Sequence, residues 1–269
     1  MPPFAVTSPD GTAITVEEWG NPAGREILFI HGFCQSRLSW RRQVEDAGLA
    51  ARFRMVTFDL RGHGASARPM TKESYDPDRL WADDVAAVVA AAGLRRPFVV
   101  GWSYAGRVIA DYLRVHGGDR FAGINYVNGR CSADSALFGP AQRHLRGMQS
   151  DDLATNIAGS RAFLRACFAK QPTSDDFETM LAFNMMVPAA IRRHVLGRPS
   201  DTTEAMAGLA CPVLVTHGRQ DEIILATMAE FVAATVKGAR LSFYEDCGHA
   251  PFWEDPARFN AELAAFVDR

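Results

Sequence analysis

The 269-residue sequence lacks the features of a nucleic-acid-binding or membrane-spanning protein. Its 29 basic and 31 acidic residues are spread along the chain and give a formal net charge of -2, so no basic stripe is available to neutralise a phosphate backbone. No apolar run approaches the roughly 20 residues that a membrane-spanning helix needs, and no basic start followed by an apolar stretch opens the chain. We therefore expect a cytoplasmic protein with no nucleic-acid or membrane partner.

Cysteine pairs, linkers and nucleotide-binding motifs are also absent. The five cysteines are scattered, odd in number and contain no CxxC pair, which argues against a disulfide framework and a zinc site. No GxxxxGK(S/T) motif is present to cradle a nucleotide phosphate. No repeat, low-complexity tract or Gly/Ser linker divides the chain into tandem domains. We expect neither a metal nor a cofactor.

Strand-like and helix-like patterns alternate along most of the chain. Short apolar runs predict strands at residues 13–19, 26–32, 54–60, 97–102, 123–128, 212–218 and 240–246. Apolar residues at helical spacing predict helices over 81–92 and 105–113. A last helix is expected to begin with Asp255 as its N-cap and Pro256 as its first residue. This alternation predicts an α/β fold with a mostly parallel sheet that helices cover on both faces.

The alternation stops between residues 132 and 209. This stretch reads as amphipathic helices without strands, and we interpret it as a helical cap between two parts of a core domain, residues 1–131 and 210–269. Ligands of α/β sheets bind outside the carboxyl ends of the strands, so a cap that leaves one of these ends lies over the site. Apolar side chains of the cap either pack on the core or line a pocket: Phe163, Phe168, Met180, Phe183, Met185 and Met186.

The stretch VVGWSYAG places a serine where a buried strand turns into a helix. Such a turn drives Ser103 towards positive φ. It also leaves room only for small neighbours, which are Gly101, Ala105 and Gly106 here. The hydroxyl then projects from the tip of the strand, beside the backbone N–H groups and the positive dipole end of the helix that follows.

Within this stretch, GWSYAG resembles the nucleophile elbow of the α/β-hydrolase family. Ala105 stands where the family usually has glycine, but it already lies in the first helical turn and carries no φ penalty. Further elements resemble the family in the same order along the chain, namely EILFIHGF, DLRGHGAS, HGRQD and GHAPFWEDP. Serine at the elbow excludes the relatives that have aspartate there, such as haloalkane dehalogenases and many epoxide hydrolases.

The resemblance implies a catalytic triad in the chain order serine, acid, histidine. Asp221 and His249 follow Ser103 in this order, and both are expected in loops past strand ends. A serine hydroxyl needs a base to remove its proton, and that base needs an acid to orient it. The resemblance also implies two donors for the oxyanion, which are the backbone N–H groups of Phe33 and Tyr104.

Other histidines and acids fit these roles less well. His31 and His217 end strands in HG dipeptides, where hydrogen bonds to the backbone are the usual role. His63 lies in a loop whose role in the family is structural. Asp246 is too near the histidine of the triad in the chain to approach its ring from behind. Some family members carry the acid one strand earlier, but Asn128 occupies that region here and cannot carry the charge.

The predicted function is a serine hydrolase that cleaves carboxylic esters or lactones of small to medium apolar substrates through an acyl-enzyme. The enzyme class is a carboxylesterase-like hydrolase, and its partner is a small-molecule substrate. Cofactor-free haloperoxidases or perhydrolases and carbon–carbon bond hydrolases use the same triad, so both stay open as alternatives. An alternative of another class is a ligand receptor with slow turnover on the same scaffold.

Five residues are predicted to contact the substrate: Phe33, Tyr104, Arg130, Met185 and Ile223. The first two also supply the oxyanion donors. Arg130 follows the strand predicted at 123–128 and lies at the pocket edge. There it either pairs with a carboxylate of the substrate or is a solvated or ion-paired surface arginine.

Overall fold

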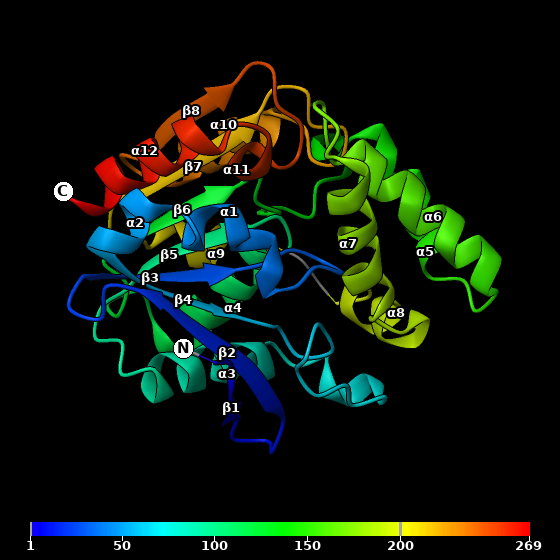
Figure 1. The fold of residues 1–269 in the computed structure, drawn as a ribbon, viewed down its shortest axis with the longest axis horizontal. Helices are drawn as coiled ribbons and strands as arrows, with labels where there is room; N and C mark the ends of the chain where they lie inside the picture. The colour runs from blue at the N-terminus through cyan, green and yellow to red at the C-terminus, as the bar shows by residue number, and fades with distance from the viewer. Residues whose placement is uncertain (1, 199–200) are drawn as a thin grey trace.

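A single mixed sheet forms the centre of the protein. The computed structural model describes residues 2–198 and 201–269 of the chain. Within these residues the sheet has eight strands in the order β1-β2-β4-β3-β5-β6-β7-β8 (Figure 1). The strands are β1 (Phe4–Thr7), β2 (Ala13–Gly20), β3 (Arg25–Ile30), β4 (Phe53–Phe58), β5 (Phe98–Trp102), β6 (Gly123–Val127), β7 (Val213–Gly218) and β8 (Arg240–Tyr244).

Only β2 runs against the other strands. β1 pairs antiparallel with β2, and β2 pairs antiparallel with β4, whereas the pairs that join β4, β3, β5, β6, β7 and β8 are parallel. Strands β5, β6 and β7 are buried along their whole length, as expected for parallel strands covered on both faces. The predicted α/β fold is thus confirmed. The sequence pattern misses β1 because four residues give too short an alternation.

Two layers of helices cover the sheet. One layer contains α3 (Asp78–Ala91), α4 (Ala105–His116), α9 (Thr203–Ala207) and α10 (Thr227–Thr235). The other contains α1 (Arg41–Val44), α2 (Ala47–Arg52), α11 (Pro251–Glu254) and α12 (Pro256–Val267). Short 3-10 turns, η1 (Arg37–Trp40) and η2 (Lys72–Ser74), lie in the connections. Helix α12 begins as predicted, since Pro256 is its first residue and the Asp255 carboxylate accepts a hydrogen bond from the Arg258 N–H at 3.3 Å.

Most of the segment between β6 and β7, including helices α5 to α8, lies beside the sheet rather than on either face (Figure 1). Its described residues contain helices and no strand: η3 (Ser135–Leu137), η4 (Pro140–His144), α5 (Leu145–Met148), α6 (Leu153–Ala166), α7 (Ser174–Met185), α8 (Ala189–Leu196) and then α9. Of these, α9 contacts α4 and α10 of the core. We therefore propose a cap domain that ends with α8, earlier than the expected boundary at residue 209.

A buried arginine holds the cap helices together. Arg192 in α8 donates hydrogen bonds to the carbonyl of Met148 in α5 at 3.1 Å and to the carbonyl of Asn184 in α7 at 2.7 Å. It also donates to the hydroxyl of Ser160 in α6 at 2.8 Å. Neutral protein dipoles thus replace water around this cation. The helices α5 to α8 are packed as one unit.

No helix in the described ranges is both long and apolar enough to cross a membrane. The same residues contain no group of three or more His, Cys, Asp or Glu side chains that could hold a metal ion. All five cysteines are free thiols, and four of them are buried.

Candidate active site

Ser103 lies in a tight turn between β5 and α4. Its φ is +55°, the left-handed conformation that the sequence predicts for this position. Its N–H donates to the Val127 carbonyl at 2.9 Å, and its own carbonyl accepts from the Arg130 N–H at 2.8 Å. These bonds to the end of β6 hold the strained residue in place.

The small residues around Ser103 are required by close packing. A Cβ added to Gly101 would lie 2.5 Å from Cδ1 of Ile109, and one added to Gly106 would lie 2.9 Å from Sγ of Cys131. Both separations are far below ordinary contact between carbon and its neighbours. The turn from strand to helix therefore leaves room for a side chain at neither glycine.

Asp221 and His249 form a hydrogen-bonded pair past the ends of β7 and β8. The carboxylate Oδ2 of Asp221 lies 2.6 Å from Nδ1 of His249. Its Oδ1 accepts hydrogen bonds from the N–H groups of Ile223 at 2.7 Å and Ile224 at 3.0 Å. Burial acts to raise the pKa of Asp221, but the neighbouring His249 and further donors lower it overall. The acid is therefore held in its ionised form behind the imidazole.

Asn128 is a partner of this acid that sequence reasoning did not identify. It follows β6 with a φ of +44°, and its side-chain Nδ2 donates to Oδ2 of Asp221 at 2.7 Å. The same amide lies 3.3 Å from the carbonyl of Gly248, next to the histidine. Asn128 thus orients the acid from the strand where some family members carry the acid itself.

The loop that carries His249 is fixed from both the core and the cap. The indole Nε1 of Trp102 donates to the His249 carbonyl at 2.7 Å, and the two rings lie 5.7 Å apart. The His249 N–H donates to the carbonyl of Cys167, just after α6 of the cap, at 2.8 Å. The imidazole therefore lies beside the end of β5, next to the turn that holds Ser103. In the described part of the chain, no hydrogen bond joins the Ser103 hydroxyl to His249 itself.

The expected oxyanion donors are free. Among residues 2–198 and 201–269, neither the Phe33 N–H nor the Tyr104 N–H donates a hydrogen bond. The loop after β3 that carries Phe33 passes close to the elbow, because a Cβ added to Gly32 would lie 3.2 Å from Cβ of Ser103. Two unpaired backbone donors beside a serine form an arrangement that can stabilise negative charge on a carbonyl oxygen.

Two buried histidines hold the loop with Phe33 in position. His63 accepts a hydrogen bond at Nε2 from the Cys34 N–H at 3.1 Å, and its Nδ1 lies 2.9 Å from the carbonyl of Arg61. His31 accepts at Nε2 from the Leu60 N–H at 3.0 Å. Burial lowers the pKa of His31 to about 4 and that of His63 to about 3, so both rings are neutral at neutral pH. Their surroundings agree with the structural role expected for them.

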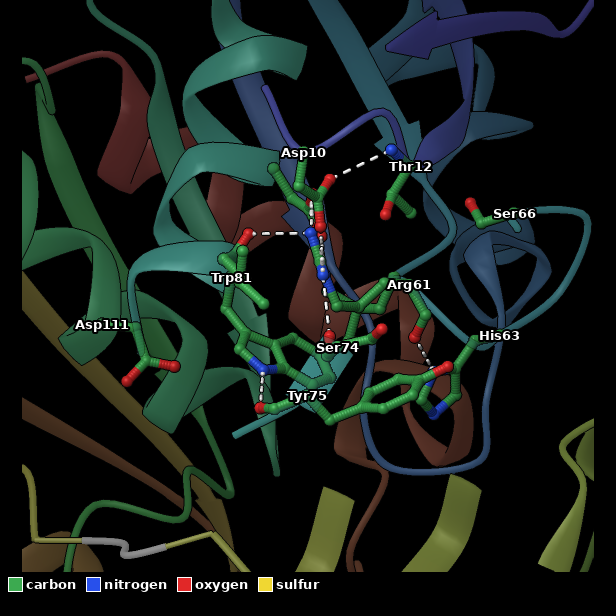
Figure 2. Close-up of polar contacts among 12 residues, drawn as sticks. Asp10, Thr12, Arg61, His63, Ser66, Ser74, Tyr75, Trp81 and Asp111 are labelled. Carbon is green, nitrogen blue, oxygen red and sulfur yellow. Dashed lines mark hydrogen bonds and ion pairs between the residues drawn. The ribbon is translucent and has the colours of Figure 1, made fainter. Parts of the chain in front are cut away.

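Arg61 anchors the loop that carries His63. Figure 2 shows its guanidinium directed between Asp10 and Ser74, with the His63 ring on the Arg61 carbonyl. It lies 2.9 Å from the Asp10 carboxylate and donates to the Ser74 carbonyl at 2.8 Å. A second carboxylate, that of Asp84, lies 2.7 Å from its Nε. Each donor of this buried cation thus has a partner, and these bonds tie the loop to the segments of Asp10, Ser74 and Asp84.

A small cavity of about 20 Å³ opens on the serine. Its lining residues are Phe33, Ser103, Tyr104, Arg130, Gln142, Leu145, Phe163, Leu196, Ile223 and Ile224. Four of the five residues predicted to contact the substrate are therefore on its wall. The fifth, Met185, is not, since its sulfur lies 3.8 Å from Nη2 of Arg192 inside the cap. The helical spacing of apolar residues along α7 places Met185 on an apolar face of the helix. It does not determine which other element this face packs against.

Two of the apolar cap residues line a different cavity. Met180 and Phe183 border a space of about 190 Å³ between α7 and the core, together with Trp19 and Trp253. Phe163 is the one apolar cap residue named from the sequence that lines the serine cavity. The sequence pattern does not single out the other four wall residues, which are Gln142, Leu145, Leu196 and Ile224.

The chain belongs to the alpha/beta hydrolase family, whose model matches residues 27–262. Among curated proteins, the non-heme haloperoxidase of Rhodococcus erythropolis is 29% identical over 284 aligned positions, which cover 99% of this chain and 99% of that protein. The bifunctional esterase/perhydrolase of Acinetobacter calcoaceticus is 28% identical over 97% of this chain and 98% of its own length. The resemblance found in the sequence motifs is therefore confirmed.

Solved structures of esterases share the fold over the whole chain. A Burkholderia cenocepacia protein assigned as an aryl esterase has a TM-score of 0.93 and 37% identity, and the match covers 99% of this chain and 98% of that one. The esterase RhEst1 from Rhodococcus sp. ECU1013 has a TM-score of 0.93 and 33% identity, with coverage of 100% and 99%. These relatives support the prediction of a hydrolase that acts on ester bonds.

Proposed function

We propose that this protein is a serine hydrolase that cleaves carboxylic esters or lactones with small to medium apolar parts. The observation that carries the proposal is the Asp221–His249 pair at 2.6 Å beside a serine with a φ of +55°. The two free N–H groups of Phe33 and Tyr104 supply the remaining requirement, which is a site for the oxyanion. The apolar lining of the serine cavity favours an apolar acyl or alcohol part.

In the first half of the reaction, Nε2 of His249 takes the proton of the Ser103 hydroxyl as the oxygen attacks the ester carbonyl. The carbonyl oxygen gains the negative charge and accepts hydrogen bonds from the Phe33 and Tyr104 N–H groups. The ionised Asp221 stabilises the imidazolium cation that forms. The intermediate then collapses, the imidazolium gives its proton to the leaving alkoxide, and an acyl-enzyme remains.

In the second half, the same histidine activates a water molecule. The water attacks the acyl carbonyl, the oxyanion forms again in the same place, and collapse releases the carboxylic acid and the Ser103 hydroxyl. A hydrogen bond between serine and histidine that is absent before substrate binding is compatible with this course, because such bonds often tighten only in the complex.

Perhydrolysis is the second candidate function, and the relatives named haloperoxidase and esterase/perhydrolase favour it. It uses the same acyl-enzyme, which hydrogen peroxide attacks in place of water, so that a peracid leaves. Atoms balance without a cofactor, since the acyl group keeps its carbonyl oxygen, the peroxide supplies the two oxygens of the –O–OH group, and His249 transfers a peroxide proton to the Ser103 oxygen as the acyl–oxygen bond breaks. The two functions differ only in which nucleophile reaches the acyl carbon.

The test compares Ser103→Ala with the parent protein on p-nitrophenyl acetate and butyrate, with Ser135→Ala on exposed η3 as the matched control. We expect the elbow variant to lose turnover and labelling by a fluorophosphonate, and the control to keep both. Comparable turnover in Ser103→Ala would overturn the proposal. Rapid labelling without turnover on esters, lactones or diketones would favour a receptor. Bromination that requires peroxide and acetate would show the perhydrolase reaction.

A further inference from the structure

Arg130 is a cation without an anionic partner on the wall of the serine cavity. Its Nε is buried and has no hydrogen-bond partner among the described residues, and no carboxylate there forms an ion pair with it. Its guanidinium carbon lies 5.0 Å from the centre of the Phe138 ring. This contact orients the planar group but does not neutralise its charge.

Three buried arginines of this protein have a carboxylate or several neutral acceptors around the charge. Arg61 is 2.7 Å from the Asp84 carboxylate, and Arg198 is 2.7 Å from that of Asp111. Arg192 is surrounded by neutral acceptors of the cap. Arg130 differs from these three, because its Nε is removed from water without an acceptor and no carboxylate of the described residues balances its charge.

A second buried arginine, Arg107, adds to the positive charge around Arg130. Arg107 in α4 donates to the Arg198 carbonyl at 2.7 Å, but its Nε and Nη2 have no partner in the described ranges. Burial lowers the pKa of Arg107 to about 10, and the charge of Arg130 contributes in the same direction. The two cations therefore disfavour each other's charge, and no carboxylate of the described residues forms an ion pair with either of them.

The backbone places Arg130 directly against the serine. The Arg130 N–H donates to the Ser103 carbonyl at 2.8 Å, and a Cβ added to Gly106 would lie 3.0 Å from the Arg130 carbonyl oxygen. Phe33, Tyr104 and Ser103 line the same cavity as the Arg130 side chain. An acyl group bound to the Ser103 oxygen thus lies in the same small cavity that Arg130 lines.

We propose that Arg130 binds a carboxylate of the substrate, and that the substrate class is a half-ester of a dicarboxylic acid or a lactone that carries a carboxylate. This inference rests on the proposed ester hydrolysis at Ser103. The carboxylate supplies the missing counter-ion and accepts hydrogen bonds from the planar fork of the guanidinium. The apolar wall of Phe33, Ile223 and the cap then contacts the carbon chain between the carboxylate and the ester.

The experiment uses monoethyl esters of C4 to C8 α,ω-dicarboxylic acids and, as neutral partners, ethyl esters of monocarboxylic acids of equal chain length. Turnover is followed by proton release in a pH-stat. The variants are Arg130→Gln and Arg130→Lys, and Arg143→Gln, at an exposed position of η4, is the control for the loss of one positive charge. Binding of monoethyl adipate and of ethyl hexanoate to the Ser103→Ala protein is measured by calorimetry.

We expect the parent protein to prefer one or more half-esters over the neutral partner. Arg130→Gln should lower kcat/KM for the preferred half-ester about 100-fold, mainly through KM, and change the neutral ester less than about threefold. Arg130→Lys should recover part of the loss, because it keeps the charge without the planar fork. Arg143→Gln should behave as the parent.

Equal losses on both esters in Arg130→Gln, or a parent protein that prefers the neutral ester, would overturn the inference and leave the proposed hydrolysis intact. Absence of all ester turnover and of labelling at Ser103 would instead overturn the proposed function. If no ester is turned over, or if an Arg130 variant does not fold, the calorimetry tests the proposed role of Arg130. Stronger binding of monoethyl adipate than of ethyl hexanoate to Ser103→Ala supports it, and equal binding contradicts it.

Discussion

Acid should loosen the loop that carries one oxyanion donor, because His31 and His63 are buried as neutral rings behind it. The rings lie 5.3 Å apart, and each accepts a backbone N–H through Nε2, so protonation would remove both acceptors and place two cations side by side. Burial lowers their pKa values from 6.5 to about 4 and about 3. The prediction is tested by comparing the stability of the folded protein at pH 7 and at pH 5.

The direction of the stability change follows from proton binding in the folded and unfolded states. Below pH 6.5 the unfolded chain binds a proton at each histidine, and the folded chain does not until pH falls to its lowered pKa. Stability from these groups is therefore fully present above 6.5 and is lost as pH falls towards 4. Each ring lowers the free energy of unfolding by about 1.4 kcal/mol for each pH unit below 6.5. At pH 5 the loss is therefore about 2 kcal/mol for one ring and roughly 4 kcal/mol for the pair.

A buried carboxyl opposes this trend in the parent protein. Burial raises the pKa of Asp111 to about 6, above its ordinary value of 3.8, so the folded state gains stability from this group as pH falls below 6. The total pH dependence of the parent therefore mixes opposite contributions. The contribution of one histidine is measured by comparison with a variant that cannot titrate at that position.

His63→Gln is that variant, because its side-chain oxygen can accept the Cys34 N–H while the amide carries no charge. Urea unfolding at pH 7 and pH 5 should show the stability deficit of the variant shrinking by about 2 kcal/mol at the lower pH. Ser135→Ala on exposed η3 serves as the control, because it removes no titratable group and should keep the pH dependence of the parent. An equal deficit of His63→Gln at both pH values would refute the assignment of a buried neutral ring.

Two further predictions concern the elbow and the acid. Asn128→Ala removes the side-chain amide that donates to Asp221 at 2.7 Å. Steady-state kinetics should show kcat/KM reduced by about 10-fold or more. An unchanged kcat/KM would show that Asp221 needs no such partner. Gly101→Ala should destabilise the protein by about 1–3 kcal/mol in thermal unfolding, because its Cβ meets Cδ1 of Ile109 at 2.5 Å. Ile109→Val deletes that methyl group and should recover part of the loss, and an additive double variant would contradict the clash.

The sequence by itself determined the elements whose cause is local. Continuous apolar runs identify β5, β6 and β7 because strands covered on both faces have no polar side. The small residues on either side of Ser103 identify a sharp turn, since side chains at Gly101 and Gly106 would clash with the helix and with the next strand end. The order of the motifs along the chain then indicates the family, because a topology fixes the order in which its loops reach the site.

Only the tertiary structure decided which distant groups meet. The bond from Asn128 to Asp221 joins loops 93 positions apart, and nothing near either residue encodes it. Met185 faces the interior of the cap, while Gln142 and Leu196 reach the serine cavity, because helical spacing defines an apolar face but not the element it packs against. The unpaired state of Arg130 is likewise a property of the whole fold, since a counter-ion could have come from any part of the chain.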